Sequence, residues 1–222
     1  MKTKEPQYQV CLDLVNEKKS TTLGLMANQV WNTDPKRLGF VLSRYKFVSK
    51  MLKGYNSVLE IGCADAWCSR LVQNEVNKLT VSDFDPIFLK DVNDRMDKDW
   101  KMLTLHHNML DSETFEKYDA IYLIDVFEHI SSNRENIFLK NITKSLNRNG
   151  VCIIGTPSVQ SQKYASKASL EGHVNCKDGV DLTNLLREYF HNVFLFSMND
   201  EVIHTGFEKM AQYLWVICTN IK

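Results

Sequence analysis

SVLEIGCADA, residues 57–66, joins a buried-strand pattern to an acidic residue and a glycine turn. Its apolar residues form the near-continuous run that is typical of a central strand in a parallel sheet. Gly62 ends the run, and a glycine lets the backbone turn tightly enough for a ligand to lie against it. Asp83 follows at the spacing at which nucleotide-binding folds place a ribose-binding carboxylate. The stretch therefore predicts an α/β fold with a nucleoside-binding site.

The turn after this strand differs from that of dinucleotide-binding proteins. Those proteins carry three glycines in G-x-G-x-x-G register, whereas this chain has Gly62, Ala64 and Trp67. Glu60 and Asp65 place negative charge where a diphosphate would lie, which favours a cation or a free amino group. S-adenosylmethionine, a sulfonium nucleoside with an amino-acid tail, fits these requirements. A nicotinamide dehydrogenase is the remaining alternative.

Four segments resemble motifs of the class I (Rossmann-like) S-adenosylmethionine-dependent methyltransferases. The first, residues 57–66, has Glu60, Gly62 and Cys63 of the family's E-x-G-C-G-x-G turn, but alanine at the next two glycine positions. Three further segments are similar to the family's second, fourth and fifth strands: LTVSDFDP at 79–86, YDAIYLIDVFEHI at 118–130 and LNRNGVCIIGTP at 146–157. Their order along the chain is that of the family.

The resemblance implies an α/β fold, a Rossmann-like three-layer αβα sandwich with a mostly parallel seven-stranded sheet and an antiparallel last strand. The pattern places strands near residues 57–61, 78–83, 102–106, 119–124, 150–155, 192–198 and 211–219. With 222 residues, 44% of them hydrophobic, the chain suits one methyltransferase domain over 1–222. We expect a helical cap or lid at 1–53 and a core at 54–222, with a substrate-covering loop at 157–180.

The resemblance also assigns cofactor contacts to residues that follow the strands. It places Glu60 and Gly62 at the methionine end, Asp83 at the ribose and Phe84 beside the adenine. Asn108 stands where aspartate is usual, and its amide carbonyl can still pair with the adenine amino group. The predicted cofactor-binding residues are Glu60, Gly62, Cys63, Ala64, Asp83, Phe84, Asn108, Met109, Leu110 and Asp125.

Histidines are the candidate catalytic residues. A sulfonium methyl group is already activated, but a hydroxyl acceptor must lose its proton, and histidine is the side chain best suited to take it near neutral pH. His129 follows the fourth strand, and His173 lies in the long connection 157–180, whose length favours a functional segment. The structural alternative for His129 is a helix-opening residue bonded to the backbone, and for His204 a surface histidine.

The segment before the first strand carries a polar and aromatic cluster that suits a lid over an acceptor. Helix capping and surface ion pairs explain part of this cluster, and an arginine within it could bind a phosphate or carboxylate. The predicted substrate-binding residues are Gln29, Trp31, Arg44, Tyr45, Asn175 and His204.

Composition excludes several classes of partner. The net charge is zero and no long basic block is present, which disfavours nucleic acid. No run of about 18 apolar residues and no signal peptide are visible, so we expect a cytoplasmic protein without membrane insertion. Six scattered cysteines indicate reduced thiols rather than disulfides or a zinc site. No metal is expected, because Asp125 with Asn149 or Asp200 has an unspecific spacing. A monomer or homodimer is expected.

Segments at 23–52, 156–176 and 192–207 are similar to a bacterial branch of methyltransferases found among cell-surface glycan genes. That resemblance implies O-methylation of a small polar acceptor such as a capsule or cell-surface sugar or phosphoramidate precursor. Two alternatives stay open. One is a non-catalytic adenosyl-binding module that acts through a protein partner, suggested by the two alanines in the turn; the other is a ubiquinone-type phenol O-methyltransferase.

Overall fold

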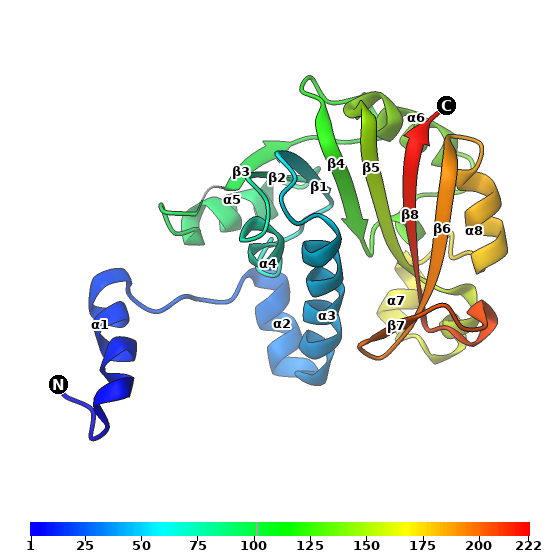
Figure 1. The fold of residues 1–222 in the computed structure, drawn as a ribbon. Coiled ribbons are helices and arrows are strands. Elements are labelled where there is room, and N and C mark those ends of the chain that lie inside the picture. The colour runs from blue at the N-terminus through cyan, green and yellow to red at the C-terminus, as the bar shows by residue number, and fades with distance from the viewer. Residues whose placement is uncertain (101) are drawn as a thin grey trace.

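The computed structural model describes residues 1–100 and 102–222 of the chain. Its strands are β1 (Ser57–Ile61), β2 (Lys78–Asp83), β3 (Met102–His106), β4 (Tyr118–Ile124), β5 (Leu146–Pro157), β6 (Phe190–Asn199), β7 (Val202–His204) and β8 (Tyr213–Ile221). They form one sheet in the order β3-β2-β1-β4-β5-β8-β6-β7 (Figure 1). Strands β1 to β5 pair in parallel, and β8 lies antiparallel between β5 and β6. The predicted Rossmann-like fold with an antiparallel last strand is confirmed.

The sequence predicts seven strands, and β7 is an eighth. It pairs antiparallel with the end of β6, where Ser197 lies opposite His204. Asp200 in the connecting turn has a φ of 50°, the left-handed conformation that tight hairpins use. The turn lacks the Asn-Gly or Asp-Gly signal of such hairpins, so its sequence reads as a plain link between strands.

Helices cover both faces of the sheet. They are α1 (Gln9–Lys18), α2 (Leu25–Thr33), α3 (Lys36–Met51), α4 (Arg70–Gln73), α5 (Pro86–Arg95), α6 (Glu135–Ser145), α7 (Lys167–Gly172) and α8 (Gly179–Leu186), with 3-10 turns η1 (Pro6–Tyr8), η2 (Phe127–His129), η3 (Val159–Tyr164) and η4 (Glu208–Met210). On β4, Tyr122 belongs to the same buried cluster as Val48 of α3, whereas Ile121 belongs to the buried cluster that contains Leu139 of α6 and Leu182 of α8. This alternation follows from the two-residue period of a strand.

The N-terminal helices differ in how they attach to the sheet. Figure 1 shows α1 standing apart from it, whereas α2 and α3 lie side by side near the sheet. Leu52, just after α3, is fully buried. The Ala27 N–H at the start of α2 donates to Asp65 Oδ2 at 2.7 Å, which ties α2 to the glycine turn. A Cβ on Gly24 would lie 2.4 Å from Asp65, so only glycine allows this close approach. Thus α2 and α3 are anchored beside the predicted cofactor turn.

The thiols of the chain are unpaired and mostly buried. All six cysteines are free in the described part of the chain, as their scattered spacing predicts. Burial raises the pKa of the Cys68 and Cys152 thiols to about 12, so these side chains stay protonated and unreactive near neutral pH. Among residues 1–100 and 102–222, no helix has the length and apolar character needed to cross a bilayer.

Candidate active site

The turn after β1 requires a glycine at its first position. Gly62 has a φ of 70°, and a Cβ there would lie 2.4 Å from Val126 Cγ2. The N–H groups of Gly62 and Cys63 both donate to the Ser82 carbonyl, at 2.8 and 3.0 Å, which joins the turn to the end of β2. Alanines 64 and 66 follow with φ of 45° and 48°. They adopt the left-handed backbone that glycine favours and bear its steric cost.

Replacing Ala64 with glycine should raise the free energy of unfolding by about 0.5–1 kcal/mol. Relief of the left-handed strain, about 1–2 kcal/mol, exceeds the extra backbone entropy that glycine loses on folding. Urea denaturation measures the difference. Ala165→Gly is the control, because Ala165 has a φ of −69° and should only lose stability. An equal loss at both positions would contradict strain at Ala64.

Two backbone N–H groups hold the carboxylate of Asp83 at the end of β2. Its Oδ2 accepts the Ala64 N–H and its Oδ1 accepts the Asp85 N–H, each at 2.9 Å. These bonds fix the carboxylate, and each oxygen keeps a further acceptor site for a hydroxyl group. Asp85, two residues further along, instead caps α5 by accepting the Ile87 N–H at 2.9 Å. The structure therefore separates the two acids by role.

Two of the predicted adenine-contacting residues, Phe84 and Asn108, line one open pocket. Phe84 is 69% exposed, and it lines this pocket with Asn108, His106, His107, Asp111 and Ser112. Asn108 Oδ1 accepts the Leu110 N–H at 3.0 Å, so the amide carbonyl already has one partner. The Met109 side chain lies in the core, and its carbonyl accepts a hydrogen bond from the Asn141 side-chain amide at 2.9 Å.

Glu60, a predicted cofactor-binding residue, contacts Tyr45, a predicted substrate-binding residue, in the protein interior. Tyr45 of α3 donates its hydroxyl to Glu60 Oε1, and Tyr122 of β4 donates to Oε2, both at 2.6 Å. Glu60 is 1% exposed, and burial raises the pKa of its carboxyl while the hydrogen bonds oppose that rise. This network fastens α3 to β1 and β4.

Tyr45→Phe should lower the free energy of unfolding by about 1–3 kcal/mol, because it leaves a buried Glu60 oxygen without its donor. Chemical denaturation measures this loss. Tyr122→Phe should behave alike, since it removes the matching hydroxyl. Tyr164→Phe is the control, because Tyr164 is 79% exposed and should change stability by less than about 0.5 kcal/mol. Equal stability of all three variants would show that the network adds nothing.

An ion pair links α3 to the end of β4. Arg44 Nη1 bonds to Asp125 Oδ2, and the guanidinium lies 3.9 Å from the centre of the Tyr213 ring. Asp125 has a φ of 57°, and its N–H donates to the Gly155 carbonyl at 3.0 Å. A predicted acceptor-binding residue and a predicted cofactor-binding residue are therefore direct partners here.

The two candidate catalytic histidines come together with a buried acid. His129 and His173 have ring centroids 5.2 Å apart, and each can offer a ligand atom within 4.8 Å of a Glu128 carboxylate oxygen. We call these three residues the imidazole cluster. His129 Nδ1 bonds to the Gly172 carbonyl and His173 Nδ1 to Gln162 Oε1, both at 2.8 Å.

Glu128 is the member of the imidazole cluster that the sequence analysis does not single out. It is fully buried, and its Oε2 accepts the Thr156 hydroxyl at 3.0 Å. Its Oε1 has no hydrogen-bond partner among the described residues. Burial, with the neighbouring Asp125 carboxylate, raises the pKa of the Glu128 carboxyl to about 8. Burial is the main cause that lowers the pKa of His173, and the neighbouring His129 ring is the second. The sequence signal for Glu128 is its position after β4 and directly before His129.

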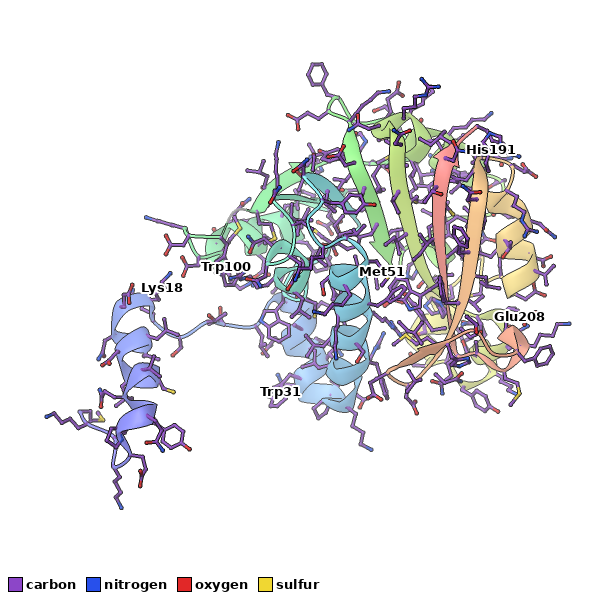
Figure 2. All side chains as sticks on the ribbon, in the orientation of Figure 1. Lys18, Trp31, Met51, Trp100, His191 and Glu208 are labelled. Atoms are coloured by element: carbon purple, nitrogen blue, oxygen red, sulfur yellow. The ribbon has the colours of Figure 1, made fainter. Side chains whose placement is uncertain are left out.

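The other predicted acceptor-binding residues have partners of their own. The side-chain amide of Asn175 donates to Glu135 Oε2 at 2.8 Å. The backbone N–H of Asn175 donates to the Glu128 carbonyl, so this residue lies next to the imidazole cluster. His204 of β7 bonds to Asn199 and Gly206, which uses both ring nitrogens. On α2, Gln29 donates to Thr33 and Trp31 is 58% exposed (Figure 2).

Comparisons with known proteins agree with this geometry. Residues 59–152 match the model of a family described as a methyltransferase domain, and no curated protein matches significantly. The N-methyltransferase NodS from Bradyrhizobium japonicum, in complex with S-adenosyl-L-homocysteine, is 17% identical with a TM-score of 0.61, over 86% of this chain and 90% of that chain. An S-adenosylmethionine-dependent methyltransferase from Clostridium acetobutylicum is 10% identical with a TM-score of 0.68, over 87% and 97%. The methyltransferase domain of bacterial CtHen1-C is 17% identical with a TM-score of 0.67, over 81% and 98%.

The family match runs from β1 into β5, so it contains the glycine turn, Asp83 and the imidazole-bearing end of β4. The likeness to solved structures extends the same fold over more than four fifths of the chain. These findings show that residues 59–152 form a methyltransferase domain and that the chain has the fold of Rossmann-like S-adenosylmethionine-dependent methyltransferases.

Proposed function

We propose that the chain methylates an oxygen atom of a small polar acceptor and that the imidazole cluster receives the acceptor's proton. S-adenosylmethionine, when bound, supplies a methyl group activated on a sulfonium, so the protein has to align the acceptor, exclude water and remove a proton. One observation carries this proposal. Both histidine Nδ1 atoms bond to carbonyl oxygens, which leaves the Nε2 lone pair of each ring free to act as a base.

The ends of β1 and β2 would hold the cofactor. We propose that the turn from Gly62 through Cys63 to Ala64 contacts the methionine portion, because this turn directly follows β1 at the carboxyl edge of the parallel strands. The fixed carboxylate of Asp83 would accept both ribose hydroxyls. Phe84 and Asn108, which line one pocket, would contact the adenine, and the backbone from Asn108 to Leu110 would follow its edge.

Glu60 and Asp125 would contribute by positioning the site. Both Glu60 oxygens bond to tyrosine hydroxyls, so we propose that this acid holds the strand before the turn in place. Asp125 pairs with Arg44, and this pair would hold α3 as part of a lid at the acceptor side. The segment 157–180 would complete that lid, because it carries His173 and the two oxygen atoms that bond to the histidine rings.

The surroundings of the imidazole cluster support a hydrophilic acceptor over an apolar phenol. Three charged or ionisable side chains lie close enough there to shift one another's pKa, namely Arg44, Asp125 and Glu128. Thr156 adds a hydroxyl group. Such groups bind hydroxyls and phosphates better than apolar tails. Within this class, we propose a capsule or cell-surface sugar, sugar nucleotide or phosphoramidate precursor as the acceptor.

A turnover assay tests the proposal. Purified protein is incubated with methyl-labelled S-adenosylmethionine and pools of nucleotide sugars, capsule precursors and phenols. The expected result is S-adenosylhomocysteine together with label on an oxygen of a polar acceptor. Label on nitrogen, or on phenols alone, would overturn the proposed acceptor. Cofactor binding without turnover on any pool would favour the non-catalytic alternative. That alternative was suggested by the two alanines of the turn, but both adopt the left-handed backbone of glycine, so they give no argument against catalysis.

A further inference from the structure

We infer that Glu128, His129 and His173 bind one divalent transition-metal ion. Two imidazoles and one carboxylate form a common protein ligand set for such ions. The three residues offer ligand atoms that all lie within 4.8 Å of one another. Donors on one ion at about 2.1 Å lie roughly 3–3.5 Å apart, so small side-chain rotations would close the site.

The hydrogen bonds behind the histidines match those of metal ligands. A metal-bound histidine usually donates its second ring N–H to a carboxylate, a carbonyl or water, which fixes the ring and directs the other nitrogen to the metal. His129 Nδ1 has the Gly172 carbonyl as partner, and His173 Nδ1 has the Gln162 carbonyl oxygen. Both partners come from the segment 157–180, so this segment supplies the outer shell of the site.

The buried acid gives an independent reason to expect a cation. Glu128 is fully buried, and its Oε1 has no partner within residues 1–100 and 102–222. A buried polar atom without a partner is costly and calls for a bound water or ion. Meanwhile the Glu128 carbonyl accepts the N–H groups of Val174 and Asn175, at 2.9 and 3.0 Å, which holds the residue in place. A metal ion would satisfy Oε1 directly.

The donor types indicate which ions suit the site. Imidazole nitrogens favour Mn²⁺, Fe²⁺, Co²⁺ or Zn²⁺ over Ca²⁺ and Mg²⁺, which prefer oxygen ligands. Three protein ligands leave coordination positions open for a small molecule. A catalytic use of the ion rests on the proposed function. The acceptor hydroxyl would take one of the open positions, and the ion would lower the pKa of that hydroxyl. The histidines would then hold the ion, and the hydroxyl would release its proton to solvent water, which reaches the cluster at the exposed His129.

Metal binding can be measured without any acceptor. The full-length protein is treated with a chelator, freed of it, and titrated with Co²⁺ by visible absorption and calorimetry. We expect one equivalent bound, with affinity lowered more than about 100-fold in His173→Gln and in His129→Gln. His191→Gln is the control, because His191 is exposed on β6 and should leave binding unchanged (Figure 2). Gln162→Leu, which removes an outer-shell partner, should weaken binding by about 10- to 100-fold.

Two results would overturn the inference. One is the absence of stoichiometric Co²⁺ binding by folded wild-type protein; the other is equal affinity in His173→Gln and His191→Gln. Turnover separates this inference from the proposed function. If chelator-treated enzyme keeps full activity while His173→Gln loses it, the ion takes no part in proton removal and the histidine base stands. If Co²⁺ binds with the expected variant pattern but no oxygen acceptor is methylated, the metal site stands and the proposed function is wrong.

Discussion

His173→Ala should lower kcat for methyl transfer by about 10²- to 10⁴-fold, the usual contribution of a residue that removes a proton. The imidazole lies 5.2 Å from the His129 ring, and its Nδ1 is already bonded to Gln162. Loss of the ring removes the free Nε2, whether this atom takes the proton itself or holds an ion that lowers the pKa of the acceptor hydroxyl. The measurement is S-adenosylhomocysteine formation at saturating donor and acceptor.

The variant should change the chemical step and leave the cofactor site intact. Calorimetry with S-adenosylhomocysteine should give the same affinity for His173→Ala as for the wild type, because the residue lies on the segment 157–180 and not at the ends of β1 or β2. His129→Ala should lose turnover to a similar degree, and His191→Ala, on exposed β6, should not. Normal turnover in both His173→Ala and His129→Ala would remove the imidazole cluster from the mechanism.

The central fold could be predicted from sequence because its signals are local. An apolar run followed by Gly62 can form only a strand and a tight turn, and the structure shows that a Cβ at this glycine would collide with Val126. Capping is equally local, as Asp85 and Pro86 at the start of α5 illustrate. Strand β7 could not be predicted in this way, since only its pairing with β6 distinguishes it from a link.

The side-chain partners in the site depend on contacts between distant segments. Glu60 lies at the end of a strand and suggests a ligand contact, yet its oxygens are taken by Tyr45 and Tyr122. The expectation of no metal rests on Asp125 with Asn149 or Asp200 and does not weigh the two histidines together. The histidine that completes the imidazole cluster comes from a segment 44 positions further along the chain, from 129 to 173, and no local pattern joins the two.

Asp83→Ala should weaken binding of S-adenosylhomocysteine by about 10²- to 10⁴-fold. Hydrogen bonds to a charged group contribute about 1.5–3 kcal/mol each, so losing two ribose contacts corresponds to such a change. The variant also removes the acceptor of the Ala64 N–H, which loosens a turn whose backbone is already left-handed. Calorimetry measures the affinity, and thermal unfolding without ligand checks that the protein remains folded.

The neighbouring acid provides a control that separates binding from stability. Asp85→Ala removes the cap of α5, so it should cost about 0.5–2 kcal/mol of unfolding free energy and leave cofactor affinity almost unchanged. Asp83→Asn keeps the shape and one carbonyl acceptor, so its affinity should fall between those of the wild type and Asp83→Ala. If Asp85→Ala lost affinity and Asp83→Ala kept it, the ribose contact would belong to Asp85. The opposite pattern is expected because Asp83 is fixed by two backbone N–H groups at the strand end, whereas the Asp85 carboxylate is committed to its helix.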